Sequence, residues 1–194
     1  MAKETFYNLS PEKKNRIIEV LRDLFKKKPF QQVTVKEIVE ELGIARGSFY
    51  QYFDDLEDAY FEILNEEVVD IHELFMALLQ ERSGELKASL EEYGEAISAL
   101  FFAEERYPIY RNRYLYWDER LACRWEEVHQ THLDIFAEPA GGGRLETEKM
   151  HYMKGVIHML IQRNFREQWT KEVFLKKYRQ HINWMMEGIA NEHI

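Results

Sequence analysis

Residues 34–53, TVKEIVEELGIARGSFYQYF, contain the pattern that decides the fold. Thr34 and Glu37 stand three apart at the start of an apolar-periodic stretch, as in a capping box, where each side chain satisfies a free backbone N–H. Gly43 follows the last apolar residue, where a helix often ends in the left-handed conformation. A second short helical stretch begins at Arg46, so we predict a helix-turn-helix. The apolar face of the first helix consists of Val35, Ile38, Val39 and Leu42.

The second helix of this motif, expected over residues 46–53, carries more hydrogen-bonding side chains than a purely structural helix needs. Phe49 and Phe53 lie four residues apart and can serve as packing anchors. Gly47 costs about 1 kcal/mol in a helix relative to alanine, which suggests that another backbone, such as a phosphate backbone, approaches closely. The alternative is an edge helix whose aromatic rings pack on a neighbouring helix. The remaining hydrogen-bonding residues are Arg46, Ser48, Tyr50, Gln51 and Tyr52.

The rest of the chain is typical of an all-α protein. Its 194 residues contain only 9 glycines and 4 prolines, too few for a turn-rich β fold. Apolar residues repeat at helical spacing, and we expect about nine helices. We place a helix-turn-helix DNA-binding domain at 1–53 and a second helical domain at 54–194. Outside the motif, the expected helices cover 11–28, 54–82, 85–102, 109–136 (with a second break allowed near Asp118), 146–166 and 171–191, and a glycine-rich loop covers 138–143.

The net charge of −9 hides an asymmetry along the chain. Residues 1–53 hold 10 Lys and Arg against 7 Asp and Glu, whereas the remainder holds 16 against 28. A basic N-terminal segment in an otherwise acidic chain is compatible with nucleic-acid binding by that segment. The single cysteine, Cys123, excludes an internal disulfide and fits a reducing compartment. No stretch approaches the ~18 apolar residues of a membrane span, and no apolar signal core occurs at the N-terminus, so we expect a cytoplasmic protein without a membrane partner.

The stretch from Phe30 to Phe53 resembles the signature of the TetR family of bacterial transcriptional regulators. The residues that carry the resemblance are Phe30, Val33-Thr34-Val35, Ile38 and the run GIARGSFYQYF that begins at Gly43. It implies an all-α fold with three DNA-binding helices, followed by a longer helical domain that senses a ligand and dimerises. It also implies that Thr34 and Tyr52 meet phosphate, and that Gly47 allows close approach to DNA.

Base recognition would fall to the second helix of the motif. In the major groove, the Arg46 guanidinium can pair bidentately with guanine and the Gln51 amide with adenine, while hydroxyl groups are permissive. Phosphate contacts would set the register, and base contacts would specify the sequence. The predicted DNA contacts are Thr34, Lys36, Arg46, Gly47, Ser48, Tyr50, Gln51 and Tyr52.

Two positions depart from the family pattern. Position 56 usually carries a phosphate-binding lysine, and position 45 often carries a serine or threonine that can cap the recognition helix. Here they are Leu56 and Ala45, which removes two expected backbone contacts. Lys36 or the run Lys26-Lys27-Lys28 can replace the lost positive charge.

An aromatic stripe recurs at spacings of three and four between residues 107 and 125. Such a stripe is either ordinary core packing or the lining of a small-molecule cavity, and the resemblance raises the weight of the cavity. The charge of an unknown ligand stays open. Arginines at 111, 113, 120 and 124 suit an anion, and glutamates at 91, 92, 95, 104 and 105 suit a cation. The predicted ligand contacts are Tyr107, Tyr110, Tyr114, Trp117 and Trp125.

The last two expected helices carry apolar faces suited to helix-on-helix association. The family builds its dimer as a four-helix bundle from such a pair. A symmetric dimer would place two recognition helices about 34 Å apart and would select a palindromic operator. The predicted dimer contacts are Met153, Ile157, Leu160, Ile182, Met185 and Ile189.

No arrangement of residues in the sequence supports catalysis, a cofactor or a metal. His129 and His132 lie three apart, but no third ligand completes a known metal pattern. Walker-type, G-x-S-x-G and paired Cys/His patterns do not occur. We therefore predict a homodimeric repressor, not an enzyme, that binds a palindromic operator in double-stranded DNA and is released by a small-molecule ligand. The alternative is a helical dimeric protein-interaction module that has lost operator specificity.

Overall fold

The computed structural model describes residues 1–68, 71–129 and 147–190, and all the regular structure in these ranges is helical. The chain forms two compact units, each described here by itself. The head unit comprises the described residues of Met1–Val69 and Pro108–His132. The body unit comprises those of Asp70–Tyr107 and Leu133–Ile194. Among the described helices, none has the length and apolar character needed to cross a membrane.

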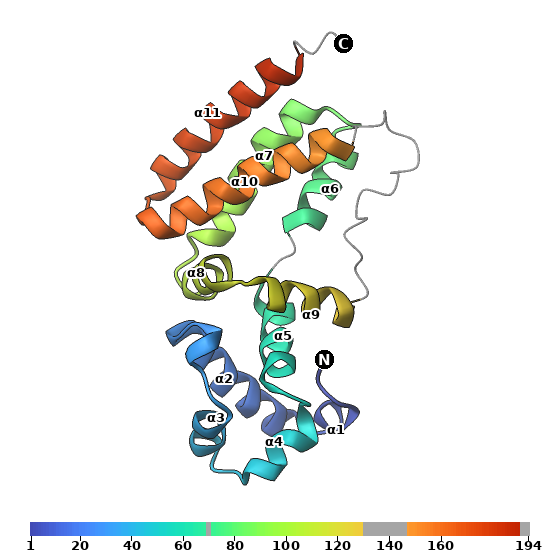
Figure 1. Ribbon diagram of the computed structural model, residues 1–194, viewed down its shortest axis with the longest axis vertical. Helices are drawn as coiled ribbons and strands as arrows, with labels where there is room; N and C mark the ends of the chain where they lie inside the picture. The colour runs from blue at the N-terminus through green and yellow to red at the C-terminus, as the bar shows by residue number, and fades with distance from the viewer. Residues whose placement is uncertain (69–70, 130–146, 191–194) are drawn as a thin grey trace. The chain divides into compact units, whose positions relative to one another are not determined.

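In chain order the head unit begins with α1, α2, the helical turn η1 and α3, followed by the short helix α4 and then α5 (Figure 1). Pro11 occupies the first position of its helix, as predicted, although the Ser10 side chain makes no capping bond. The capping box is confirmed: the backbone N–H of Glu37 donates to Thr34 Oγ1 over 3.3 Å, and that of Thr34 donates to Glu37 Oε2 over 3.1 Å. Gly43 ends the helix with a φ of 66°, the left-handed conformation that favours glycine. The elements are α1 (Glu4–Tyr7), α2 (Pro11–Lys27), η1 (Phe30–Gln32), α3 (Val35–Leu42), α4 (Arg46–Tyr52) and α5 (Leu56–Glu67).

Two further helices of the head unit come from much later in the chain. They are α8 (Tyr107–Tyr116), whose first residue belongs to the body unit, and α9 (Glu119–His129). The break allowed near Asp118 is confirmed, because Asp118 Oδ1 accepts a bond of 2.9 Å from the backbone N–H of Leu121 at the start of α9. The compact units therefore divide the chain differently from the functional boundary expected after residue 53.

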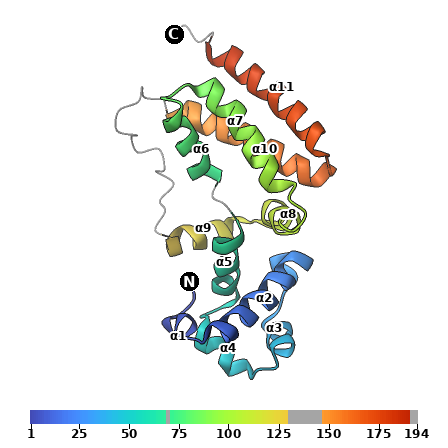
Figure 2. The ribbon, with the colours of Figure 1, turned by 180° about the vertical axis from the view of Figure 1, so that it is seen from behind.

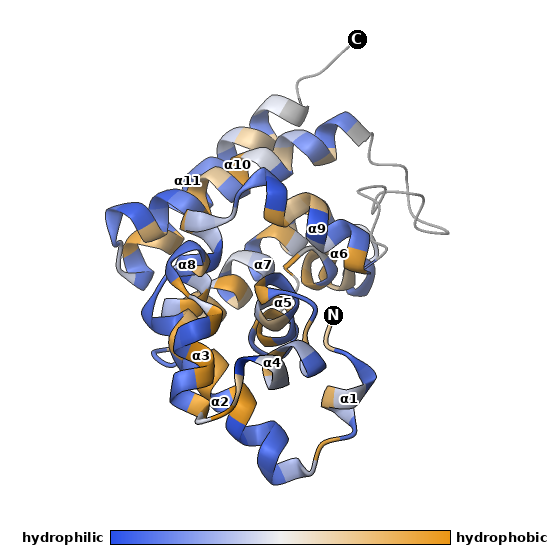
Figure 3. Ribbon diagram, turned by 60° about the horizontal axis from the view of Figure 1, so that its bottom comes forward, coloured by the Kyte–Doolittle hydropathy of each residue, from blue (hydrophilic) through white to orange (hydrophobic). Residues whose placement is uncertain are grey.

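Aromatic rings form much of the core of the head unit. Tyr60 of α5 lies 4.8 Å from Phe25 and 5.1 Å from Phe30, measured between ring centroids. Phe53 lies 5.0 Å from Phe6 of α1 and 5.3 Å from Phe49 of α4. The apolar face predicted for α3 points into this core, since Ile38, Val39 and Leu42 are buried. Hydropathy colouring shows hydrophobic and hydrophilic segments alternating along α2 and α3, as amphipathic helices require (Figure 3).

The body unit contains α6 (Ile71–Glu81), α7 (Leu86–Phe101), α10 (Thr147–Glu167) and α11 (Lys171–Ala190). The long helices α7 and α11 pack against each other, and α6 and α10 complete the unit (Figure 2). Gly94 permits this contact, because a Cβ there would lie 2.3 Å from a ring carbon of Tyr178. The Tyr178 hydroxyl donates to the Leu90 carbonyl over 2.8 Å. This buried bond fixes the register of the two helices.

Two differences from the expected helices have local causes. The apolar seam expected to run through 54–82 is interrupted, because Val68 adopts an extended conformation after α5. Helix α1 was not predicted, because four residues are too few to show a helical repeat. With these two features, the described residues contain eleven α-helices, compared with the nine or so expected from the sequence. The loop expected at 138–143 lies outside the described residues.

Candidate nucleic-acid interface and effector cavity

The predicted DNA contacts lie at the start of α3 and along α4. Thr34 and Lys36 are exposed at the N-terminal end of α3, and the nearest carboxylate to the Lys36 ammonium is that of Glu40, at 3.7 Å. On α4, Arg46, Gly47 and Gln51 are exposed, and Ser48 is half-buried. Tyr50 is exposed over 39% of its surface. One continuous stretch of the head unit therefore presents seven of the eight predicted side chains or backbone positions to solvent.

Arg46 and Tyr50 form a pair on one face of α4. A guanidinium nitrogen of Arg46 donates to the Tyr50 hydroxyl over 3.4 Å, and the guanidinium carbon lies 5.9 Å from the tyrosine ring centre. Among the residues that the structure describes, Arg46 has no carboxylate partner. Its charge is therefore not neutralised within the chain and is available to an external anion or base edge.

Gly47 and Tyr52 occupy contrasting environments. A Cβ built at Gly47 would meet no heavy atom within 4 Å, so packing in the described chain does not require a glycine there. Tyr52 is only 6% exposed, and its ring lies 6.4 Å from that of Phe6. Its packing ties α4 to α1, and a DNA contact by Tyr52 stays a prediction that depends on the small part of the side chain still accessible.

The N-terminal segment caps the end of α4. The Lys3 backbone N–H donates to the Tyr52 carbonyl over 2.8 Å, and the Lys3 ammonium donates to the Tyr50 carbonyl over 2.8 Å. The Thr5 hydroxyl donates to the Gln51 carbonyl that lies between them. The last carbonyls of a helix have no partner within it, which matters for a helix of seven residues. We refer to Lys3 and Thr5, with these bonds, as the N-terminal clamp.

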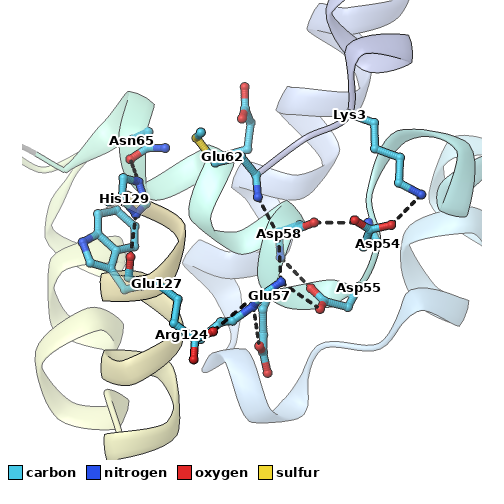
Figure 4. Close-up of polar contacts among 12 residues, drawn as sticks. Lys3, Asp54, Asp55, Glu57, Asp58, Glu62, Asn65, Arg124, Glu127 and His129 are labelled. Carbon is cyan, nitrogen blue, oxygen red and sulfur yellow. Dashed lines mark hydrogen bonds and ion pairs between the residues drawn. The ribbon is translucent and has the colours of Figure 1, made fainter. Parts of the chain in front are cut away.

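Acidic groups contact the N-terminal clamp and the helix that follows it (Figure 4). The Lys3 ammonium lies 2.7 Å from Asp54, and its hydrogen bond holds the pKa of that carboxyl below the ordinary value. The Tyr7 hydroxyl donates to Glu62 of α5 over 2.7 Å. Burial and this bond raise the pKa of Tyr7 well above the usual range. Sequence reasoning missed this arrangement, since all of these pairs are about 50 residues apart in the chain.

The arginines of α9 pair with carboxylates of the first turn of α5 and of the residue before it, and Figure 4 shows Arg124 beside these carboxylates. Asp55 caps α5 by accepting from the Asp58 backbone N–H over 2.8 Å. Arg124 lies 3.8 Å from the buried carboxylate of Asp58 and 3.9 Å from those of Asp55 and Glu57. Arg120 forms an ion pair with Glu57. Two of the arginines that could have met an anionic ligand are therefore already paired with carboxylates.

Helix α8 is joined to α2 and η1 by polar bonds. The amide of Asn112, which is 5% exposed, donates to the carbonyls of Phe25 over 2.9 Å and Lys26 over 3.2 Å. These are free carbonyls in the last turn of α2. The Gln31 amide, in η1, donates to the Tyr116 carbonyl over 2.7 Å. A displacement of α8 would therefore break or move the hydrogen bonds at the end of α2.

The structure distributes the predicted ligand contacts over two clusters. Tyr107 packs in the body unit against Phe165, with ring centres 5.4 Å apart. In the head unit, the ring centre of Phe61 lies 6.1 Å from that of Trp117 and 5.1 Å from that of Trp125. Tyr110 is fully buried, and Tyr114 is half-buried. The stripe is therefore largely packing in the described structure, and ligand binding by these residues stays a prediction.

His129 takes part in the same aromatic cluster. Its ring stacks on Trp125 with centres 3.8 Å apart, and its Nε2 lies 3.0 Å from Asn65 Oδ1. His132 lies outside the described residues. Within the described ranges, no group of three or more His, Cys, Asp or Glu side chains is placed to hold a metal ion.

Two of the hollows in the described part of the body unit are well formed. The first is an apolar cavity of about 40 Å³ between α6, α7 and α10. It is lined by Phe75, Met76, Leu90, Tyr93, Met150, Met153, Lys154, Ile157 and His158. The second is an open polar groove of about 530 Å³ between α7 and α11. It is lined by Arg82, Ala88, Glu91, Glu92, Glu95, Tyr178, Arg179, Ile182 and Asn183. Neither includes a residue of the aromatic stripe.

Five of the six predicted dimer contacts are buried within the single chain. They are Met153, Ile157, Leu160, Ile182 and Met185. The side chain of Ile189 lies outside the described set. The large apolar side chains that α10 and α11 expose are instead Tyr152, Met159, Val173 and Trp184. These exposed residues could have been found in the sequence, because each lies on the face of its helix opposite to the apolar stripe that forms the core.

The fold and the exposed face of α4 define a helix-turn-helix regulator, and comparison with known families agrees. The family model described as "Bacterial regulatory proteins, tetR family" matches residues 17–62, and that described as "Tetracyclin repressor, C-terminal domain" matches 86–188. The second match alone covers more than half of the chain. The protein belongs to the TetR family of bacterial transcriptional regulators.

Individual relatives agree with this assignment. The uncharacterized HTH-type transcriptional regulator YfiR of Bacillus subtilis is 40% identical over 48 residues, which are 25% of this chain and 23% of that protein. A TetR family regulator from Chloroflexus aurantiacus superimposes with a TM-score of 0.52 at 24% identity, over 97% of this chain and 98% of that one. NalD of Pseudomonas aeruginosa, the secondary repressor of the MexAB-OprM multidrug efflux pump, gives 0.62 at 16% identity, over 90% and 95%. These structural likenesses show the fold.

Proposed function

We propose that this regulator is a homodimeric repressor that binds a palindromic operator in double-stranded DNA and leaves it when a small molecule binds. The observation that carries the proposal is the exposed face of α4, with an arginine that has no carboxylate partner among the described residues. It would act in the cytoplasm, where its DNA lies, and without catalytic activity. No cofactor is required for this function.

The DNA contacts divide by chemistry. Arg46 and Gln51, both exposed on α4, would read guanine and adenine edges in the major groove. Thr34 and Lys36, at the exposed start of α3, would bind phosphate together with the helix N-terminus. The hydroxyl groups of Ser48, Tyr50 and Tyr52 would add phosphate or permissive base contacts. Gly47 would let the DNA backbone approach α4 closely.

The dimer would form through α10 and α11. Tyr152, Met159 and Trp184 are between 37% and 56% exposed, which is unusual for side chains of this size and suits an interface. The predicted contacts Met153, Ile157, Leu160, Ile182 and Met185 lie behind them in the core of the chain and would support that surface. A two-fold axis through such an interface would present two copies of α4 to two half-sites.

Effector release would use α8. Its first residue, Tyr107, packs on Phe165 in the body unit, and its buried Asn112 caps α2 in the head unit. A ligand that moves the first turn of α8 would therefore change the position of α2 and, through it, of the recognition helix. The ligand acts by favouring an arrangement that no longer fits the operator.

The test is selection of bound duplexes from a random DNA pool by the purified full-length protein. We expect a palindrome whose half-sites lie about one helical turn apart. Failure to enrich any sequence, with protein shown to be folded and free of ligand, would contradict the proposal. That outcome would favour a dimeric interaction module that has lost operator specificity.

A further inference from the structure

The apolar cavity of the body unit has a lining suited to a small aliphatic group. Aromatic rings form part of its wall, with Phe75 and Tyr93 meeting edge to face at 5.4 Å between centres. Leu90 and Ile157 supply aliphatic surface. The methionines of the wall are Met76, Met150 and Met153. Methionine side chains are flexible and polarisable, so this wall can adapt to a guest.

Two basic side chains interrupt the apolar lining, and both come from α10. Lys154 and His158 lie four residues apart and therefore share one face of the helix. Both are half-buried. Among the residues that the structure describes, Lys154 has no hydrogen-bond or ion-pair partner. A half-buried lysine without a carboxylate partner, beside an apolar cavity, favours an anionic group on whatever occupies the cavity.

The polar groove of the same unit lacks this property. Its Glu92 receives two hydrogen bonds from Arg82, at 2.8 Å and 2.7 Å, and its Glu95 is paired with Arg179. These carboxylates are already neutralised by arginines of the groove itself. A cationic ligand would have to compete with both pairs, which leaves the exposed Glu91 as the one other carboxylate in the lining of the groove.

We propose that the effector is a compact aliphatic anion whose chain enters the cavity between α6, α7 and α10 and whose charged group meets Lys154 and His158. The inference rests on the proposed function, because it names the ligand class of the site that would release the operator. It also decides between the anionic and cationic ligands that the sequence leaves open.

The size of the cavity limits the ligand. A volume of about 40 Å³ accommodates roughly three water molecules, so a short alkyl chain enters without change and a longer one requires the methionines to rotate. Each added methylene that is buried should raise affinity by about fourfold. The increase should stop once the chain outgrows the space that the methionines can provide.

The experiment is calorimetric titration of the full-length protein with octanoate, octan-1-ol and octyltrimethylammonium, which share one chain length and differ in charge. We expect octanoate to bind roughly ten- to a hundredfold more tightly than the alcohol, as a charge-assisted pair allows. Lys154→Met should remove that preference, and Lys154→Arg should keep most of it. Lys176→Met, on the exposed surface of α11 and outside the cavity, is the matched control.

The location of the bound ligand is tested by filling the cavity with a larger side chain at Met76, a half-buried residue of its lining. Met76→Trp should abolish octanoate binding, whereas Met76→Leu, of similar size to the original side chain, should retain it. Thermal unfolding of each variant shows whether it has folded, and a variant that has not is replaced by Ile157→Phe. Binding that survives a folded, filled variant would place the ligand elsewhere and overturn the proposal.

The outcomes separate this inference from the proposed function. Equal affinity for octanoate and octanol would mean that the Lys154 stem only covers apolar surface, and tighter binding of the ammonium would reverse the ligand charge; either result overturns the inference. Absence of binding by all three probes also overturns it. The operator selection is scored independently, so a protein that selects no DNA yet binds octanoate through Lys154 refutes the repressor and leaves the anion site supported.

Discussion

Two short helices of the head unit, α4 and α9, combine arginine with aromatic side chains, yet their neighbours give these side chains opposite roles. On α9, Arg120 and Arg124 are paired with the carboxylates at the start of α5, and Trp125 is stacked on His129. On α4, Phe49 is buried, but Arg46 keeps its charge without a carboxylate partner among the described residues. Residue type alone does not identify a binding surface. What distinguishes α4 is an arginine without a carboxylate partner among the described residues, on a helix whose other face is buried.

The largest expected effect is on DNA recognition by α4. Arg46→Ala should weaken operator binding by roughly ten- to a hundredfold and relax the preference for guanine at one position of each half-site. Arg120→Ala, which removes an arginine from α9, should leave base preference unchanged. Competition binding with a series of operator variants measures both. Full affinity and unchanged preference in the Arg46 variant would remove α4 from the assigned role.

The next effect concerns stability of the head unit. Asn112→Ala leaves the carbonyls of Phe25 and Lys26 without their buried donor, at a cost of about 1–3 kcal/mol in the free energy of unfolding. Asn183→Ala, at an exposed position of α11, should change this free energy by less than about 0.5 kcal/mol. Urea titration followed by circular dichroism measures both. Equal midpoints would mean that α8 does not support α2 through this amide.

A smaller effect tests the N-terminal clamp. Thr5→Val keeps the side-chain shape but removes the donor to the Gln51 carbonyl, which should cost about 0.5–1.5 kcal/mol. The loss should appear as faster amide hydrogen exchange in α4 and as a few-fold weaker operator affinity. Thr170→Val removes a threonine hydroxyl that caps α11 instead. If the amides of α4 exchange at the same rate in the two variants, the clamp does not hold this helix.

The smallest effect is a pH dependence of the same clamp. Because its hydrogen bond with Lys3 lowers the pKa of Asp54 in the folded state, the ionised carboxylate favours folding. This contribution is fully present above the unfolded pKa of about 3.9 and is lost as the pH falls through the lower folded value. The stability difference between the wild type and Asp54→Asn should therefore shrink toward zero below pH ~4. A difference independent of pH would exclude the charge as its cause.

Prediction from the sequence succeeded where the determining interactions are local. The capping box at Thr34, the end of α3 at Gly43 and the first residue of α4 at Arg46 all involve residues within four positions of one another. It was less successful where a feature depends on distant partners. The split after α5 and the short α1 escaped detection, because one interrupts a continuous apolar pattern and the other is too short to have a pattern.

The candidate sites divide in the same way. The polar face of α4 could be predicted from its seven residues and the one that follows, because the buried rings of Phe49 and Phe53 fix which face points outward. The cavity could not be predicted from the sequence, because its lining comes from three helices, and the lining residues of α7 and α10 lie about 60 positions apart, as Leu90 and Met150 do. The aromatic stripe is regular along the chain, but the sequence does not show that its rings pack on partners from α5 and α10, and ligand binding by them stays a prediction.

The sequence by itself determined the helix-turn-helix, its capping and the polar composition of its recognition helix, since these depend on backbone geometry and on neighbours within one or two turns. Only the tertiary structure decided which charges remain available. The carboxylates that neutralise Arg120 and Arg124 are more than 60 residues away, and so are the residues of α6 and α7 that line the cavity beside Lys154. A side chain's chemistry is set by its type, but its availability is set by whatever folding brings against it.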